Sequence, residues 1–155
     1  MTEATQEASQ PVFNIEKIYV KDISLEIPHA PQIFLERGSP QIDVQLHTQT
    51  ARIDEAVFEV LVTTTVTSKL GEKVMFLIEA KQAGIFEVRN VPGGELEPIL
   101  SVMCPNILFP YLREVVSDVA VRAGFAPVLL NPINFDALYQ QQKQQQMQPV
   151  ATTTH

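Results

Sequence analysis

Four runs in which apolar and polar residues alternate occupy much of the N-terminal part of the chain. They constrain the fold more than any other feature of the sequence. Alternation with a period of two is typical of a β-strand that buries one face and exposes the other. The connections between the runs are mainly short or rich in turn-forming residues, which favours antiparallel pairing. The sequence therefore predicts a four-stranded antiparallel sheet from the runs 13–27, 41–48, 57–70 and 74–88.

The first and last of these runs place acidic residues opposite their apolar faces. The apolar or aromatic set of the first run is Phe13, Ile15, Tyr19, Ile23, Leu25 and Ile27. Asp22 and Glu26 lie on the other face of that run, and Leu77 and Glu79 lie on the outward face of the last run. The outer face of the sheet is thus predicted to be acidic with one apolar side chain. Two interpretations remain open: an ordinary solvated face, or an acidic docking surface.

The C-terminal part of the chain has the pattern of helices. From Pro110 onward, apolar residues recur at the i, i+3, i+4 spacing of one helical face, and Gly124 is placed to end that helix. Because proline is costly inside a helix, we expect the helix to begin at Pro110 or to be kinked there against a shorter preceding turn. A short final helix is expected after Asn134, with Phe135 and Tyr139 in an apolar patch, and it is expected to be mobile. Strands followed by helices predict the α+β class.

The two ends of the chain differ in composition from the middle. Residues 1–11 are polar and acidic, and residues 141–155 are rich in glutamine. We therefore expect a disordered acidic tail at 1–11, a single domain at 12–140 and a flexible tail at 141–155. No secretory signal is recognised at the start, and no apolar stretch is expected to reach the ~20 residues that span a bilayer. With one cysteine and no internal disulfide, the chain is expected in the cytoplasm.

The charge balance limits the partners of the chain. Its net charge is −7 and its isoelectric point is near 4.9, which argues against nucleic acid and against insertion at anionic membranes. A basic or partly unfolded polypeptide would be attracted. Hydrophobic residues make up 45% of the chain and charged residues only 19%. A monomer with so few charged residues cannot easily keep its whole surface polar, and this favours self-association.

The sequence offers no constellation of residues with catalytic or metal-binding spacing. Cys104 has no base near it in sequence and is expected to be buried and inert. The run VPGGELEP at 91–98 lacks the lysine and serine or threonine of a phosphate-binding loop and predicts a turn. The backbones of Asp22 and Glu26 are about 13 Å apart along one strand, too far for a glycosidase pair. We therefore predict that the chain is not an enzyme and has no cofactor or metal.

Four segments of the chain closely resemble the SecB family of bacterial protein-export chaperones. With the strands that connect them, the resemblance covers about residues 13–140. The segments are KIYVKDISLEIPHAP (17–31), FLIEAKQAGIF (76–86), CPNILFPYLRE (104–114) and NPINFDALY (131–139). The resemblance implies a cytosolic homotetramer, built as a dimer of dimers with helices between the sheets. It also implies that the chain binds unfolded secretory precursors without ATP and delivers them to the SecA motor.

The resemblance also assigns roles to individual residues. The positions that match the SecA-binding residues of the family are Asp22, Glu26, Leu77 and Glu79, which are the outward set described above. The positions that match the client-binding groove are Ile42, Val44, Leu46, Phe76, Tyr111 and Tyr139. Two features depart from the family pattern. The loop before the second run has Gly38 where many members have tryptophan, and the tail is glutamine-rich where many relatives are more acidic.

Two other functions fit the residues when the resemblance is set aside. A carrier for one small apolar ligand would need a polar group inside its cavity, and the sequence offers no candidate. A dedicated assembly factor or inhibitor would bind one folded partner and would show no preference for denatured chains.

Overall fold

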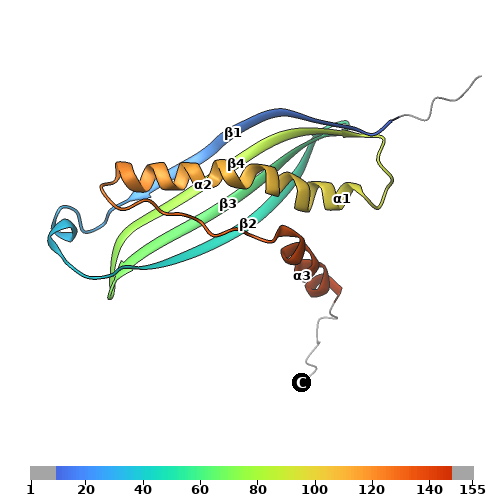
Figure 1. The fold of residues 1–155 in the computed structure, drawn as a ribbon. Coiled ribbons are helices and arrows are strands. Elements are labelled where there is room, and N and C mark those ends of the chain that lie inside the picture. The colour runs from blue at the N-terminus through green and yellow to red at the C-terminus, as the bar shows by residue number, and fades with distance from the viewer. Residues whose placement is uncertain (1–9, 148–155) are drawn as a thin grey trace, which may run out of the picture.

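The computed structural model describes residues 10–147 and shows one antiparallel sheet with a long helix across one face (Figure 1). The spatial order of the strands is β1-β4-β3-β2, so the connection from β1 to β2 crosses from one edge of the sheet to the other, and β1 pairs with β4. The predicted α+β class and its four-stranded sheet are confirmed. The strands are β1 (Val12–Glu26), β2 (Gln41–Asp54), β3 (Val57–Leu70) and β4 (Lys73–Arg89).

Strand β2 is longer than its side-chain pattern indicates. The alternating run stops near residue 48, yet pairing with β3 continues to Asp54, opposite Val57. Residues 49–54 are mostly polar and β2 lies at the edge of the sheet, so backbone hydrogen bonds rather than an apolar face hold this end of the strand. The turn to β3 places Ala56 at a φ of 56°, which reverses the chain tightly.

Two irregularities in β1 change which side chains face the core. Its pairing with β4 shifts register between Ile15 and Lys17 and again between Val20 and Asp22. Each shift adds one residue and reverses the alternation of faces. Tyr19 therefore lies on the outer face, opposite Ala83, and its predicted place among the apolar residues of the first run is wrong.

One continuous helix crosses the sheet, from Leu96 to Arg122. Pro110 lies inside the helix, so the expectation that the helix begins there is wrong. The burial of neighbouring side chains, including Leu108 and Leu112, outweighs the local cost of about 3 kcal/mol for a proline in a helix. The helix consists of α1 (Leu96–Pro98), a π-helical turn (Ile99–Met103) and α2 (Cys104–Arg122).

The expectation that no apolar stretch is long enough to span a bilayer is wrong for this helix. By length and composition alone, its 27 residues are long and apolar enough to cross a bilayer. The core helix of a globular domain meets the same criterion, and here the apolar stripe of α2 packs on β4 and β3. Packing against the sheet accounts for its apolar character.

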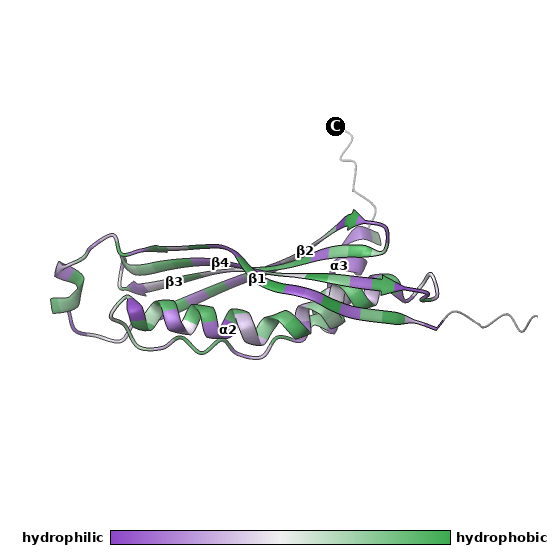
Figure 2. Cartoon of the chain, turned by 90° about the horizontal axis from the view of Figure 1, so that it is seen from above, coloured by the Kyte–Doolittle hydropathy of each residue, from purple (hydrophilic) through white to green (hydrophobic). Residues whose placement is uncertain are grey.

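The core lies between the sheet and α2, which form two layers (Figure 2). Leu108, Leu112 and Val116 on α2 are completely buried against the even-numbered side chains of β3 and β4. Gly84 on β4 allows this close approach, because a Cβ atom there would lie 2.9 Å from the side chain of Leu108 and 2.7 Å from Phe86.

The predicted C-terminal end of α2 at Gly124 and the predicted N-terminal cap of α3 at Asn134 are confirmed. Gly124, with a φ of 90°, follows α2, and the N–H of Phe125 donates to the carbonyl of Ala120 in the arrangement typical of a glycine-terminated helix. The final helix is α3 (Phe135–Met147), and the Asn134 side-chain oxygen accepts a hydrogen bond from the N–H of Ala137 at 3.0 Å. The helix extends through 141–147, the first part of the expected flexible tail. Residues 1–9 and 148–155 of the expected tails lie outside the described residues.

Candidate functional site

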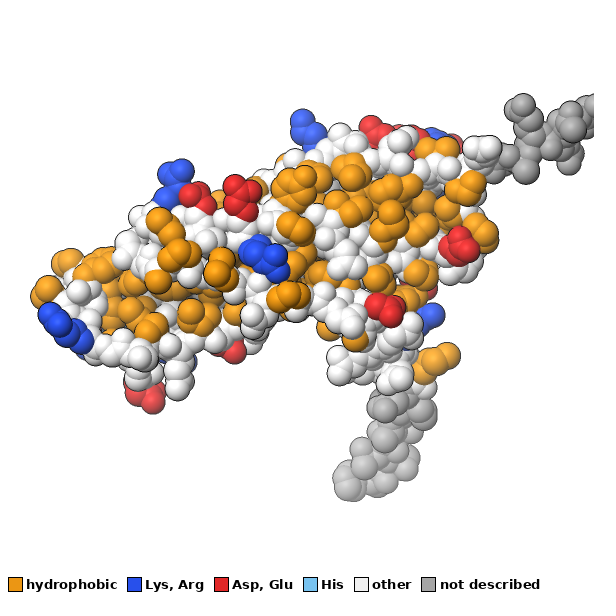
Figure 3. Space-filling model, in the orientation of Figure 1, with side chains coloured by type: hydrophobic (Ala, Val, Ile, Leu, Met, Phe, Trp, Pro, Cys, Tyr) orange, Lys and Arg blue, Asp and Glu red, His pale blue; other side chains and the backbone are white. Residues whose placement is uncertain are grey.

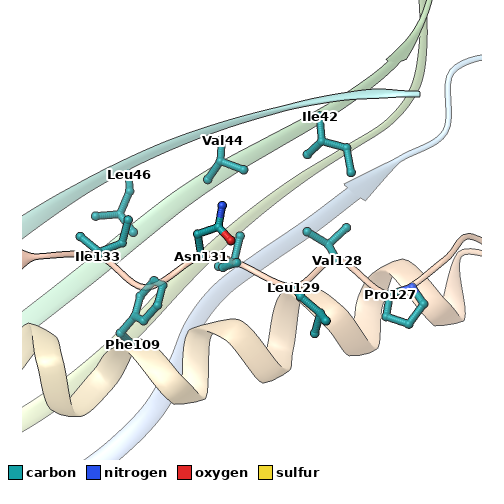
Figure 4. A pocket seen from close by; sticks show the side chains of 10 residues that line it. Ile42, Val44, Leu46, Phe109, Pro127, Val128, Leu129, Asn131 and Ile133 are labelled. Carbon is teal, nitrogen blue, oxygen red and sulfur yellow. The ribbon is translucent and has the colours of Figure 1, made fainter. Parts of the chain in front are cut away.

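An apolar groove lies between the edge strand β2 and the segment that joins α2 to α3 (Figure 4). Its volume is about 410 Å³. Side chains of β2 point toward residues 127–133, and Phe109 of α2 also lines the groove. We call this cavity the apolar groove. Its lining residues are Ile42, Val44, Leu46, Phe109, Pro127, Val128, Leu129, Leu130, Asn131 and Ile133.

The groove leaves apolar side chains available to a ligand. Ile42 is 49% exposed, Val44 is 42% exposed and Leu129 is 75% exposed. The helix-bearing face, on which the groove opens, gathers hydrophobic side chains (Figure 3). Asn131 is the only lining residue with a polar side chain among those described. A surface of this kind binds by removing apolar area from water and is tolerant of sequence.

The six predicted groove residues fall into two groups. Ile42, Val44 and Leu46 line the groove together on β2. The other three lie elsewhere. Phe76 is buried in the core with its ring centroid 4.8 Å from that of Phe125. Tyr139 is buried on α3 beside a separate polar hollow, and Tyr111 is 46% exposed on α2.

Sequence reasoning missed the wall of the groove that the connecting segment supplies. Residues 127–133 read PVLLNPI, an apolar stretch between two prolines with no helical or strand period. Proline disfavours helix both at its own position and at the one before it, so this segment remains extended beside the sheet. Loops ordinarily expose polar side chains to water, so an apolar run in an extended connecting segment is the sequence feature that could have indicated this wall of the groove.

The four residues predicted to bind SecA lie together on the outer face of the sheet. Glu26 on β1 is directly opposite Leu77 on β4. Glu79 is opposite Ser24, which lies between Asp22 and Glu26 on the same face of β1. Asp22 and Glu26 are exposed, and Leu77 and Glu79 are half-buried. We call these four residues the acidic patch. Lys81, opposite Asp22, is the nearest basic residue in register.

A second group of charged residues lies further along the same face. Glu59 on β3 accepts hydrogen bonds from the Tyr19 hydroxyl and from the Lys21 ammonium group, the latter at 2.8 Å. We call Tyr19, Lys21 and Glu59 the Glu59 cluster. The hydrogen bond to Glu59, with partial burial and the nearby negative charge, raises the pKa of Tyr19 from 10.0 to about 12. The bonds from Lys21 and Tyr19 lower the pKa of Glu59 below its ordinary value of 4.5.

These pKa shifts predict how the cluster contributes to stability. A lowered pKa means that Glu59 stabilises the folded state above pH 4.5 and loses this contribution as the pH falls through its folded pKa. A raised pKa means that Tyr19 contributes fully below pH 10.0 and loses its contribution as the pH rises through about 12. The free energy of unfolding of wild type should therefore exceed that of Glu59→Gln most between these limits. Urea titrations of both proteins across the pH range measure this difference, and a difference that does not vary with pH would contradict it.

Cys104 is buried, as predicted. Burial raises the pKa of its thiol to about 12, so the reactive thiolate is scarcely populated near neutral pH. Among residues 10–147, no group of three or more histidine, cysteine, aspartate or glutamate side chains is arranged to hold a metal ion. The surfaces that distinguish this chain are the apolar groove and the acidic patch.

Comparisons with known proteins identify the family. Residues 6–146 match the model of the family described as preprotein translocase subunit SecB. The protein-export protein SecB of Nitrosomonas europaea is 64% identical over 148 residues, which cover 94% of this chain and 90% of that protein. The protein-export protein SecB of Methylobacillus flagellatus is 58% identical over 153 residues, which cover 99% of this chain and 98% of that protein.

A solved structure supports the fold. The SecB-like chaperone of Mycobacterium tuberculosis, in complex with a ChAD peptide from an antitoxin, aligns with a TM-score of 0.64 at 16% identity. The alignment covers 78% of this chain and 90% of that one, and it confirms the α+β architecture. The sequence matches decide between the chaperone, the small-ligand carrier and the dedicated assembly factor in favour of the first. The chain belongs to the SecB family: it is a protein-export chaperone and not an enzyme.

Proposed function

We propose that this chain captures unfolded preproteins in its apolar groove and presents them to the SecA motor through its acidic patch. The observation that carries the proposal is the groove itself, which is open, about 410 Å³ in volume and lined almost entirely by apolar side chains. Unfolded chains expose apolar segments that folded proteins bury, so such a groove selects the unfolded state. Binding only the unfolded state opposes folding by mass action, and neither ATP nor a cofactor is required.

The functional unit is a homotetramer, a dimer of dimers. Strand β1 is an edge strand, and Ile15, Ile23 and Leu25 on it are between 38% and 47% exposed. An apolar edge with unpaired backbone groups is a surface that proteins cover. Pairing with a second copy would cover it. Several grooves on one assembly would then engage a single client together and raise its effective affinity.

The acidic patch is the docking surface for SecA. Three carboxylates and Leu77 on a flat sheet face suit a basic partner that inserts one apolar contact, and complementary charge speeds encounter. The groove opens on the helix-bearing side and the patch lies on the opposite face of the sheet. A client and the motor can therefore be bound at the same time. We place this function in the cytoplasm, where preproteins are still unfolded and SecA is available.

A refolding experiment tests the capture of unfolded chains. The purified protein, at a stoichiometric amount and without nucleotide, is expected to delay the refolding of a slow-folding preprotein diluted from denaturant. The recovery of native fluorescence or activity of the preprotein measures the delay, and a small folded protein of similar charge serves as the control. Refolding at the unassisted rate would count heavily against the proposal.

Charge reversal on the patch tests the docking surface. Glu79→Lys is expected to weaken binding to SecA by roughly tenfold or more, because it removes an attraction and adds a repulsion at a half-buried position. Glu55→Lys makes the same change in an exposed residue at the β2–β3 turn and should leave the affinity near wild type. Isothermal titration of SecA at low and moderate salt measures both. Equal affinities for the two variants would exclude the patch as the docking surface.

A further inference from the structure

The acidic patch depends on one extra residue in β1. Before this residue, Tyr19 is opposite Ala83 on the outer face and Val20 is opposite Gln82 on the inner face. After it, Asp22 is opposite Lys81 and lies on the outer face. Lys21 is the residue inserted between these pairs, so it forms a β-bulge that reverses the alternation. The bulge turns the acidic side chains outward and the apolar ones, Ile23 and Leu25, toward the helix side.

Without the bulge, the same sequence would present a different face. If the pairing before Val20 were kept, a one-residue slip would move Ile23 and Leu25 to the outer face. Asp22 and Glu26 would then point to the side of the sheet that packs on the core. The presence of the acidic patch is therefore a consequence of where the bulge lies, rather than of composition alone.

The bulge is held from both faces of the sheet. On the outer face, Glu59 binds both Tyr19 and Lys21, the residues on either side of Val20. Glu59 belongs to β3, so its contacts reach across β4, on which Ile85 is opposite Glu59 and Ala83 is opposite Tyr19. On the inner face, the side-chain amide of Gln82 donates to the carbonyl oxygen of Tyr19 at 3.1 Å, and Gln82 is only 2% exposed.

The ion pair between Lys21 and Glu59 is less exposed on its Glu59 side than an ordinary surface ion pair. The Glu59 side chain is 17% exposed, against 48% for Lys21. A carboxylate that is mostly removed from water and accepts two hydrogen bonds holds its partners more firmly than an exposed pair does. Glu59 thus lies on the central strand β3 and restrains the bulge in the edge strand β1.

We propose that Glu59 is a positioning residue, which fixes the β1 bulge through Tyr19 and Lys21 and thereby holds Asp22 and Glu26 outward for docking. The docking part of this inference rests on the function proposed above. The claim that Glu59 fixes the bulge does not depend on that function, because it concerns only the conformation of β1. Glu59 need not touch the partner to affect its binding.

The test uses the full-length assembled protein and four variants. Glu59→Gln removes the negative charge of Glu59, and Lys21→Met removes its ion pair with Lys21. Lys21→Arg keeps a cation at position 21. Glu87→Gln is the matched control: Glu87 is a carboxylate on the same outer face that accepts a hydrogen bond from Asn14 of β1, away from Lys21. Circular dichroism establishes that each variant is folded.

Two measurements without any partner report on the bulge. Tyrosinate absorbance sums the three tyrosines of the chain, which has no tryptophan, so the difference between a variant and wild type follows Tyr19. Its pKa is expected to return from about 12 toward 10.0 in Glu59→Gln and to remain near 12 in Glu87→Gln. Hydrogen exchange of the backbone amides at 20–22 should quicken by about tenfold or more in Glu59→Gln and Lys21→Met, and Lys21→Arg should restore protection. Unchanged exchange in both disruptive variants would overturn the inference.

A third measurement reports on docking. The affinity for SecA is expected to fall by about three- to tenfold in Glu59→Gln and Lys21→Met, and to recover in Lys21→Arg. Faster amide exchange with an unchanged affinity would overturn the positioning role, provided that Glu79→Lys still weakens binding. If Glu79→Lys has no effect either, the docking function itself has failed, and the amide exchange alone decides whether Glu59 holds the bulge.

Discussion

Replacing Leu112 by alanine is expected to lower the free energy of unfolding by about 2–5 kcal/mol. Leu112 is completely buried where α2 packs on the sheet. Truncation removes apolar contacts and leaves a cavity, which the closely packed core around it fills only in part. Since α2 is held to the sheet by this one stripe, few other contacts compensate.

Equilibrium unfolding in urea measures this effect, with wild type and variant at the same protein concentration because the stability of any chain that self-associates depends on concentration. Leu129→Ala is the matched control: it removes the same atoms from a side chain that is 75% exposed, and it should cost less than about 0.5 kcal/mol. A similar loss in both variants would contradict the packing of α2 described here.

Replacing Val44 by aspartate is expected to weaken the binding of unfolded clients by roughly ten- to hundredfold. Val44 lies in the middle of the apolar groove, between Ile42 and Leu46. A charge there must be covered by an apolar client segment and lose its water without a partner, which costs several kcal/mol when complete. Val44 is 42% exposed in the free chain, so the substitution should leave the fold intact.

The neighbouring residue provides the control for this prediction. Gln45→Asp puts the same charge on the same strand, one residue away and on the opposite face of the sheet. Fluorescence anisotropy of a labelled, permanently unfolded preprotein gives both affinities. A client affinity that falls equally in the two variants would show that net charge, and not the groove, controls binding.

The regular parts of the fold could be predicted from the sequence, because they bury one face completely. β3 and β4 are central strands, so their alternating side chains are sorted into buried and exposed sets, and both strands occur where predicted. The end of α2 at Gly124 and the cap of α3 at Asn134 were also predictable, since each depends on one residue type with a specific backbone role.

The remaining features depend on contacts that no local pattern records. The two register shifts in β1, between Ile15 and Lys17 and between Val20 and Asp22, reverse the alternation without a turn residue to mark them, so the side-chain pattern places Tyr19, which lies between them, on the wrong face. Pro110 continues a helix because burial around it outweighs a local penalty. The second half of β2 is polar on an edge, where backbone pairing alone decides its length.

The candidate site also has one part that could be predicted from the sequence and one part that could not. The acidic patch was recognisable from alternation in two strands, and the register brings its members together. The groove was only half recognisable: its β2 wall alternates, whereas residues 127–133 form the other wall without any period. Phe76 and Tyr139 are aromatic residues whose burial could not be told from groove lining by sequence.

Site-specific crosslinking tests the central claim most directly. A photoreactive side chain is placed at position 44, in the groove, or at position 45, on the opposite face of the same strand. On illumination with a denatured preprotein, we expect crosslinks from position 44 and few from position 45. Crosslinks that are equal at the two positions, or stronger at position 45, would contradict capture in the groove.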